Sequence, residues 1–278
     1  MTPEFSVIIP THGRPDLLRE AVESVLQQTV ADFECIVVDD ASAEPPTLPD
    51  DPRLRLICRE QNGGPPAARN TGIAAAAGTY LAFLDDDDVW RDGRLAAARD
   101  GHRRAPVAIC WQSTLGDDIS RASGRVLDGD VEAVVLDGMI PHLGATSIER
   151  ARAPRFDEKY EASDDVEWWL RVSQSLEVAT NPYVGLLYRV HAGPRSRTGQ
   201  RNRLHDASML FDQYAAWFAA HPRAKAFRLS RMGLSALQVN DRKLAVQCFA
   251  GSLRLRPRPR TAWHLLRALA SRGGPADA

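Results

Sequence analysis

Short apolar runs alternate with helical patterns through the first hundred residues, and this alternation constrains the fold more than any other feature. The apolar runs predict buried strands at residues 5–9, 34–38, 54–57 and 80–84. Stripes of apolar residues at helical spacing predict helices at residues 16–27 and 67–77. Strands that alternate with crossover helices are typical of a parallel sheet. We therefore expect an α/β fold with helices on both faces of the sheet.

The pattern becomes weaker after Arg104 and turns fully helical after Arg201. Short strands are predicted at residues 107–111, 131–136, 145–148, 176–179 and 185–190, and a helix at 164–174. Gly233, Ala245 and Phe249 then have the spacing of the small and large positions in a tetratricopeptide-type helical hairpin. Because a single hairpin cannot bury its own apolar face, we expect it to pack on the preceding helix and on residues 262–270.

Charge is distributed unevenly along the 278 residues, although the net charge is only −1. Residues 223–272 contain twelve basic side chains and one acidic side chain, Asp241. This predicts a boundary between a domain at 1–222 and a basic helical extension at 223–278. The extension has an electrostatic face that suits anionic lipid or an acidic partner protein, or is simply a solvated basic surface. Sparse aromatic residues and the lack of a recognition motif disfavour nucleic acid as a partner.

Composition and run lengths restrict the class of protein. With 44% hydrophobic residues, the chain can bury a core and is not disordered. No apolar run approaches the roughly 20 residues of a membrane span, and no basic leader precedes the first strand, so we expect a cytoplasmic protein, peripheral at most to the inner face of the plasma membrane. The four cysteines lie too far apart for a zinc or redox motif. Only three of the 35 basic residues are lysine, which indicates a GC-rich bacterial genome.

Polar and glycine-rich segments follow each of the first four predicted strands. They are Thr11–Arg14, Asp39–Asp40, Asn62–Gly64 and Asp85–Asp88. Ligands of open parallel sheets bind beyond the carboxyl ends of the strands, so these segments predict a nucleotide site. Four adjacent carboxylates repel one another unless a cation neutralises them, and a divalent metal that bridges them to a diphosphate would do so. The alternative is a solvated acidic turn that caps the next helix.

Four sequence blocks together resemble the family 2 glycosyltransferases of the GT-A fold. The blocks are SVIIPTHGR from Ser6, VVDDAS from Val37, NGG with ARNTG from Asn62, and FLDDDDVW from Phe83. The resemblance implies a nucleotide-diphospho-sugar transferase fold over residues 4–195, with Mn²⁺ or Mg²⁺ as cofactor. It also implies transfer of a sugar from a nucleotide-sugar donor to a hydroxyl of a glycan or a lipid-linked saccharide, as in polysaccharide biosynthesis.

The resemblance also implies roles for individual residues. Those implied for the donor pocket are Pro10, Thr11, His12, Arg14, Asp39, Asp40, Asn62, Gly63, Arg69, Asp85 and Asp86. Asp40, with Asp39, would hydrogen-bond the base, and Arg69 would face the diphosphate. In the Asp-x-Asp motif, Asp85 and Asp87 would hold the metal, joined by His191. A histidine after a strand is otherwise a structural residue.

The acceptor side of the resemblance depends on the segment SDDVEWWLR from Ser163, where the family more often has Glu-Asp. Asp165 matches the catalytic base, which takes the proton of the acceptor hydroxyl as that oxygen attacks the anomeric carbon. A single displacement of this kind inverts the anomeric centre. Asp164 and Asp165 also suit the N-terminal cap of a helix, a role compatible with catalysis.

Two other functions fit parts of the sequence. Asp85-x-Asp87-x-Val89 after an apolar strand satisfies the nucleophile pattern of haloacid-dehalogenase-type phosphatases. That class expects the motif on an early strand, with a lysine poised before a further acidic pair. The third interpretation is an inactive GT-A fold that serves as an interaction module through residues 224–272.

Overall fold

The computed structural model describes residues 2–119, 122, 126–130, 140–190 and 197–270, which form two compact units. The first unit contains the described residues up to 130 together with 140–159 and 164–190. The second contains residues 160–163 and 197–270. The boundary predicted between residues 222 and 223 falls within the second unit.

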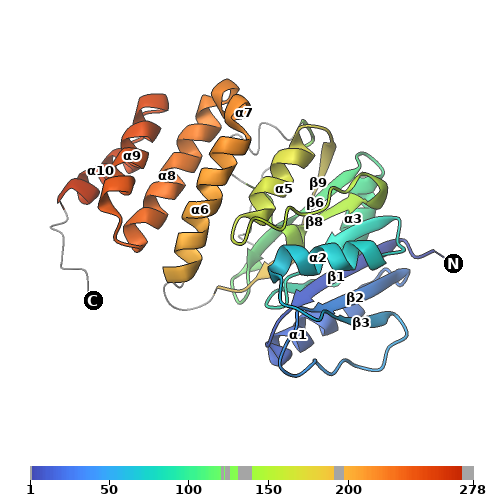
Figure 1. Cartoon of the computed structure of the whole chain (residues 1–278). Helices are drawn as coiled ribbons and strands as arrows, with labels where there is room; N and C mark the ends of the chain where they lie inside the picture. The colour runs from blue at the N-terminus through green and yellow to red at the C-terminus, as the bar shows by residue number, and fades with distance from the viewer. Residues whose placement is uncertain (1, 120–121, 123–125, 131–139, 191–196, 271–278) are drawn as a thin grey trace. The chain divides into compact units, whose positions relative to one another are not determined.

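A mixed sheet forms the centre of the first unit (Figure 1). Among the described residues it has nine strands in the order β3-β2-β1-β4-β8-β6-β9-β5, with β7 paired to β9. Their bounds are β1 Phe5–Thr11, β2 Phe33–Asp39, β3 Leu54–Cys58, β4 Tyr80–Phe83, β5 Val89–Trp90, β6 Val107–Thr114, β7 Gly129–Asp130, β8 Thr146–Glu149 and β9 Glu177–Tyr188. The strands β1 to β4 are parallel, as predicted, whereas β8 runs antiparallel to both β4 and β6.

Helices cover both faces of this sheet. The helices of the first unit are α1 Pro15–Leu26, α2 Gly64–Ala75, α3 Arg94–His102 and α5 Asp164–Ser173, with short 3₁₀ turns η2 Leu143–Ala145 and η3 Arg150–Arg152. Val7 and Ile9 of β1 pack with α1 and α3 in one buried cluster. Ile8 points to the other face, where a Cβ atom on Gly72 of α2 would lie 2.4 Å from its Cγ2. Alternate residues of one strand thus face two helical layers, which explains why the strand is apolar throughout.

Several elements differ from the sequence-based predictions. The two strands expected at 176–179 and 185–190 are one strand, β9, because bulges opposite Cys110 and Trp111 absorb the irregularity around Asn181 and Pro182. The helix predicted to begin at Ala67 begins at Gly64, where a φ of +79° favours glycine, and the two prolines that follow suit the first turn of a helix. The strand β5 and the helix α3 were not predicted. The strand predicted at 131–136 lies outside the described residues.

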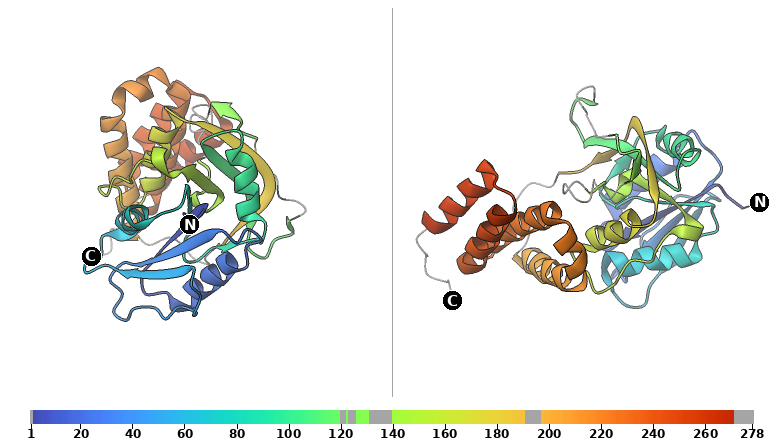
Figure 2. Two further views of the ribbon diagram at one scale, coloured as in Figure 1. Left: turned by 90° about the vertical axis from the view of Figure 1, so that its right-hand side faces the viewer. Right: turned by 90° about the horizontal axis from the view of Figure 1, so that it is seen from above.

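The second unit is helical, as predicted from the sequence (Figures 1 and 2). Its helices are α6 Arg197–Gln213, α7 Ala215–Ala220, α8 Pro222–Gln238, α9 Arg242–Leu255 and α10 Pro259–Ala270. Gly233 of α8 lies against the ring of Phe249 of α9, and His264 of α10 stacks on the same ring at 5.7 Å. The predicted hairpin is therefore α8–α9, and it packs on α6 and α10 as expected. None of the described helices is long and apolar enough to cross a bilayer.

Candidate active site

A pocket of about 370 Å³ opens beyond the carboxyl ends of β1, β2 and β4. Most of its lining comes from the three strand-end segments and from the start of α2. The lining residues are Pro10, Thr11, His12, Arg14, Asp40, Asn62, Gly64, Pro65, Ala68, Arg69, Asp85, Asp86 and Asp87. The parallel strands end at one edge, which is why segments distant in sequence meet there.

Asp40 closes one end of this pocket and is almost fully buried. Its carboxylate accepts hydrogen bonds from the backbone N–H groups of Gly63 and Gly64, at 3.1 and 2.7 Å, and from the guanidinium of Arg59. The carboxylate thus satisfies donors that a helix N-terminus leaves unpaired, and it fixes the glycine-rich loop at the start of α2. His12 Nδ1 lies 3.0 Å from the carbonyl oxygen of the same aspartate.

Asp39 and Gly63 do not line the pocket. The carboxylate of Asp39 accepts hydrogen bonds from the hydroxyl and backbone N–H of Ser42, so it holds the turn that follows β2. Gly63 acts through its N–H on Asp40. Both residues therefore shape the backbone beside the pocket.

The acidic turn after β4 forms the opposite wall. Asp86 accepts a hydrogen bond from the hydroxyl of Thr11 at 2.7 Å, and Arg14 Nη1 lies 3.3 Å from Asp86 and 3.1 Å from Asp87. Burial raises the pKa of Asp86, against the opposing effects of Thr11 and Arg14. The side chain of Arg14 is 52% exposed, so its guanidinium lies between the acidic turn and solvent.

Arg69 connects the acidic turn to the N-terminus of α5. Its guanidinium is 2.6 Å from Asp85 Oδ1 and 2.5 Å from Asp164 Oδ2, and it lies over the ring of Phe156. Arg69 and Asp164 are both buried, and Nε of Arg69 lacks a partner among the described residues. Although burial opposes it, the charge of Arg69 lowers the pKa of Asp85. The positive charge of Arg69 therefore offsets the negative charges of Asp85 and Asp164, which come from separate elements.

Asp164 and Asp165 occupy different environments although they are neighbours in sequence. Burial raises the pKa of Asp164 to about 6, against the opposing charge of Arg69. Asp165 is partly exposed, and its Oδ1 accepts the N–H of Val166 at 2.8 Å. The pair forms the first two residues of α5, which begins where the sequence predicts a helix at 164–174. Of the two carboxylates, Asp165 is the more exposed to solvent.

Two tryptophans fix α5 against the sheet. Trp168 stacks on Phe156 at 5.5 Å and meets Phe83 of β4 edge to face, and its indole N–H donates to the Pro154 carbonyl. The indole N–H of Trp169 donates to the carbonyl of Pro141 at 3.0 Å. The predicted apolar face of this helix, which includes Trp169 and Leu170, is buried. The helix thus fixes both its own aspartates and the segment that precedes η2.

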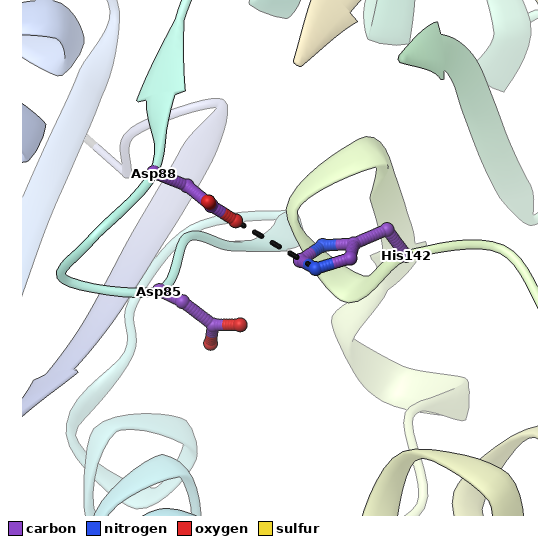
Figure 3. A group of neighbouring side chains, drawn as sticks. All are labelled: Asp85, Asp88 and His142. Atoms are coloured by element: carbon purple, nitrogen blue, oxygen red, sulfur yellow. Dashed lines mark ion pairs between the residues drawn. The ribbon is translucent and has the colours of Figure 1, made fainter. Parts of the chain in front are cut away.

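That segment places His142 beside the acidic turn (Figure 3). Its Nε2 lies 3.6 Å from Asp88 Oδ2, and one ligand atom each of Asp85, Asp88 and His142 lie within 4.8 Å of one another. Asp88 also accepts the N–H of Arg189 at 2.8 Å, and burial raises its pKa to about 6, against the opposing charge of His142. Two carboxylates and an imidazole suit Mn²⁺, and the carboxylates suit Mg²⁺. These donors therefore fit the predicted cofactor.

The sequence missed three residues of this region: Arg59, Asp88 and His142. Asp88 was visible as the fourth member of the aspartate run, but its partner lies in the least patterned part of the chain. Asp87 lines the pocket beside Arg14 and stays a predicted ligand, and His191 lies outside the described residues.

Sequence comparison matches residues 6–129 to the model of the family "Glycosyl transferase family 2". The succinoglycan biosynthesis protein ExoO of Rhizobium meliloti is 30% identical over 284 residues, which cover 87% of this chain and 79% of ExoO. ExoW of the same organism is 38% identical over 124 residues, 41% of this chain. The chain spans only 39% of the length of ExoW.

Solved structures show the same fold at low sequence identity. Residues 1–349 of TarS from S. aureus, in complex with UDP-GlcNAc, match with a TM-score of 0.62 and 17% identity, over 96% of this chain and 87% of that one. The mannosyltransferase PcManGT of Pyrobaculum calidifontis, in complex with GDP-Man and Mn²⁺, matches with a TM-score of 0.58 and 18% identity, over 97% and 80%. The family match over residues 6–129 and the match to ExoO over most of both chains show that the chain belongs to glycosyl transferase family 2.

Proposed function

We propose that the chain transfers a sugar from a nucleotide-diphosphate sugar to an acceptor hydroxyl, with inversion at the anomeric carbon. The observation that carries this proposal is the bridge from Asp85 through Arg69 to Asp164. It joins the acidic turn of the pocket to the start of α5, where Asp165 lies. The bridge thus connects the turn that would face the donor with the helix start whose Asp165 would face the acceptor. The family assignment leaves the phosphatase alternative without support.

The donor would lie in the pocket at the strand ends. The base would lie at the end formed by His12, Asp40 and Asn62, where polar groups are fixed by the glycine-rich loop. The diphosphate would face Arg14 and Arg69, because their guanidinium groups are the cations that line this pocket. The structures of TarS with UDP-GlcNAc and of PcManGT with GDP-Man support a donor of this class.

Asp85, Asp88 and His142 would hold a divalent cation, together with Asp87 or His191 as the sequence predicts. When bound, such an ion neutralises charge that develops on a diphosphate leaving group. The Mn²⁺ in the PcManGT complex supports this cofactor class. The chain's own contribution is to hold the three donors together through the turn after β4 and the segment before η2.

Asp165 would act as the general base. The acceptor hydroxyl has a pKa far above neutrality, so its proton must leave as the oxygen attacks the anomeric carbon. That proton passes to the carboxylate of Asp165 while the bond from the anomeric carbon to the diphosphate oxygen breaks. Asp164 is buried and held by the ion pair with Arg69, so it is less accessible to an acceptor hydroxyl than Asp165. Because ExoO and ExoW are named for succinoglycan biosynthesis, we propose a glycan or lipid-linked saccharide as the acceptor.

The D165N variant tests the base directly. Calorimetric titration with a panel of UDP-, GDP- and dTDP-sugars plus Mn²⁺ first identifies the donor. With that donor, we expect D165N to lose transfer by roughly 100-fold or more, because general base catalysis contributes about that much. Donor affinity should stay within about twofold, since the carboxylate reacts only with the acceptor.

The control is D100N, which removes a carboxylate whose side chain is 58% exposed on α3. It should leave both transfer and donor affinity unchanged. Normal turnover by D165N would show that another residue takes the proton. Failure of every nucleotide sugar to bind the wild-type protein would contradict the proposed function itself.

A further inference from the structure

The last described helix, α10, has two apolar faces. Its inner face packs on the core of the helical unit, with Thr261 and Ala268 buried and Leu265 in contact with the cluster around Phe249. On the outer side, Trp263, Leu266 and Leu269 are exposed by 53%, 64% and 50%. A helix that is apolar around most of its circumference is usually covered on both sides. The outer side of α10 is therefore a candidate contact surface.

Basic side chains are concentrated in α10 and in the residues that precede it. Residues 242–270 contain no acidic residue and seven basic ones: Arg242, Lys243, Arg254, Arg256, Arg258, Arg260 and Arg267. Arg260 and Arg267 are exposed on α10 itself, and the guanidinium of Arg267 lies 4.6 Å from the centre of the Trp263 ring. Three of the other arginines, Arg254, Arg256 and Arg258, lie at or next to the turn between α9 and α10, where the chain reverses. The surface is thus both apolar and strongly cationic.

We propose that the outer face of α10, formed by Trp263, Leu266, Leu269, Arg260 and Arg267, docks on an anionic lipid bilayer. A helix that lies in the membrane interface combines an apolar face with flanking arginines and with aromatic residues at headgroup depth. The lack of acidic side chains over residues 242–270 suits anionic headgroups, whereas a second copy of this face would bring like charges together. This inference goes beyond sugar transfer and does not depend on it.

Vesicle flotation with the full chain tests the proposal. We expect the protein to float with phosphatidylcholine vesicles that contain phosphatidylglycerol, and to stay at the bottom with phosphatidylcholine alone. Each cation near an anionic surface strengthens binding about fivefold, so R260Q/R267Q should weaken it by roughly 25-fold. W263Q/L266Q should weaken it by at least roughly tenfold, because two half-exposed apolar side chains no longer enter the interface. Salt near ~1 M should also release the wild-type protein.

The matched controls remove the same groups elsewhere on the surface. R103Q/R152Q removes two exposed arginines of the first unit, and V126Q removes an exposed apolar side chain. Both should bind vesicles like the wild type. Because the substituted α10 residues are exposed, circular dichroism and thermal unfolding of the variants should match the wild type.

Three results would overturn the proposal: equal binding to neutral vesicles, equal losses in the controls, or no binding at all. The main alternative to a bilayer is a second copy of this chain. Sedimentation velocity over a range of protein concentrations tests for such self-association. A wild-type dimer that W263Q/L266Q converts to monomer, without vesicle binding, would assign the outer face of α10 to self-association.

Discussion

Replacing Arg69 with methionine should destabilise the first unit by several kcal/mol at pH 7. The substitution keeps the apolar volume over Phe156 but leaves Asp85 and Asp164 without the guanidinium that lies 2.6 and 2.5 Å from them. Removing one partner of a buried ion pair typically costs about 3–5 kcal/mol. Protonation sets an independent upper limit on this loss of stability, because a carboxylate left without its partner can neutralise its charge by taking up a proton. For Asp85, whose ordinary pKa is 3.8 and is lowered by Arg69 in the wild type, this costs about 4 kcal/mol at pH 7.

The cost of protonation also makes the destabilisation by R69M depend on pH. At pH 5 protonation of Asp85, with its ordinary pKa of 3.8, costs only about 1.6 kcal/mol, so the loss of stability should shrink to roughly 2 kcal/mol. Urea unfolding followed by tryptophan fluorescence measures it, because Trp168 and Trp169 are fully buried beside this site. With a slope of about 2 kcal/mol per molar, the midpoint should fall by about 2 M at pH 7.

Two further variants make the test specific. R103M removes an arginine that is 72% exposed and pairs with Asp100 on the surface, and it should change stability by less than about 0.5 kcal/mol. The double variant R69M/D164N should recover part of the loss, because it removes one of the two stranded charges. A loss below about 1 kcal/mol for R69M, or one that does not vary with pH, would refute the compensation argument.

Two other outcomes are expected. Burial lowers the pKa of His102 to about 4 from an ordinary 6.5, so the unfolded chain binds more protons between these values and stability falls as the pH falls. The stability difference between the wild type and H102Q should therefore shrink by about 3 kcal/mol from pH 7 to pH 4, and a constant difference in urea titrations would contradict this. H142A should weaken Mn²⁺ binding at least roughly tenfold in paramagnetic resonance titrations, because it removes a proposed ligand. The control H205A lies outside the cluster and should not change Mn²⁺ binding.

Local pattern predicted the parallel half of the sheet well because each strand there is an apolar run closed by a turn. Strand and helix alternate in that half, so the residues after each strand meet by topology alone. The helix α3 was missed because its buried face includes a charged residue. Arg94 is fully buried, donates through Nε to the carbonyl of Gly144 and lies over the ring of Trp90. A hydrophobic pattern predicts that such an arginine lies on the surface, although it is buried here.

The position of His142 shows where sequence reasoning ends at this site. The aspartates after β4 are predictable because one turn makes them neighbours, whereas His142 lies more than fifty residues further along the chain. The antiparallel strand β8 brings its segment beside β4, and two distant indoles hold it there. Trp90 donates to the Gly144 carbonyl at 2.8 Å, and Trp169 donates to that of Pro141 at 3.0 Å. Because backbone carbonyls accept both hydrogen bonds, the side chains near His142 in the sequence give no sign of them. Long-range packing therefore decides which imidazole faces the carboxylates.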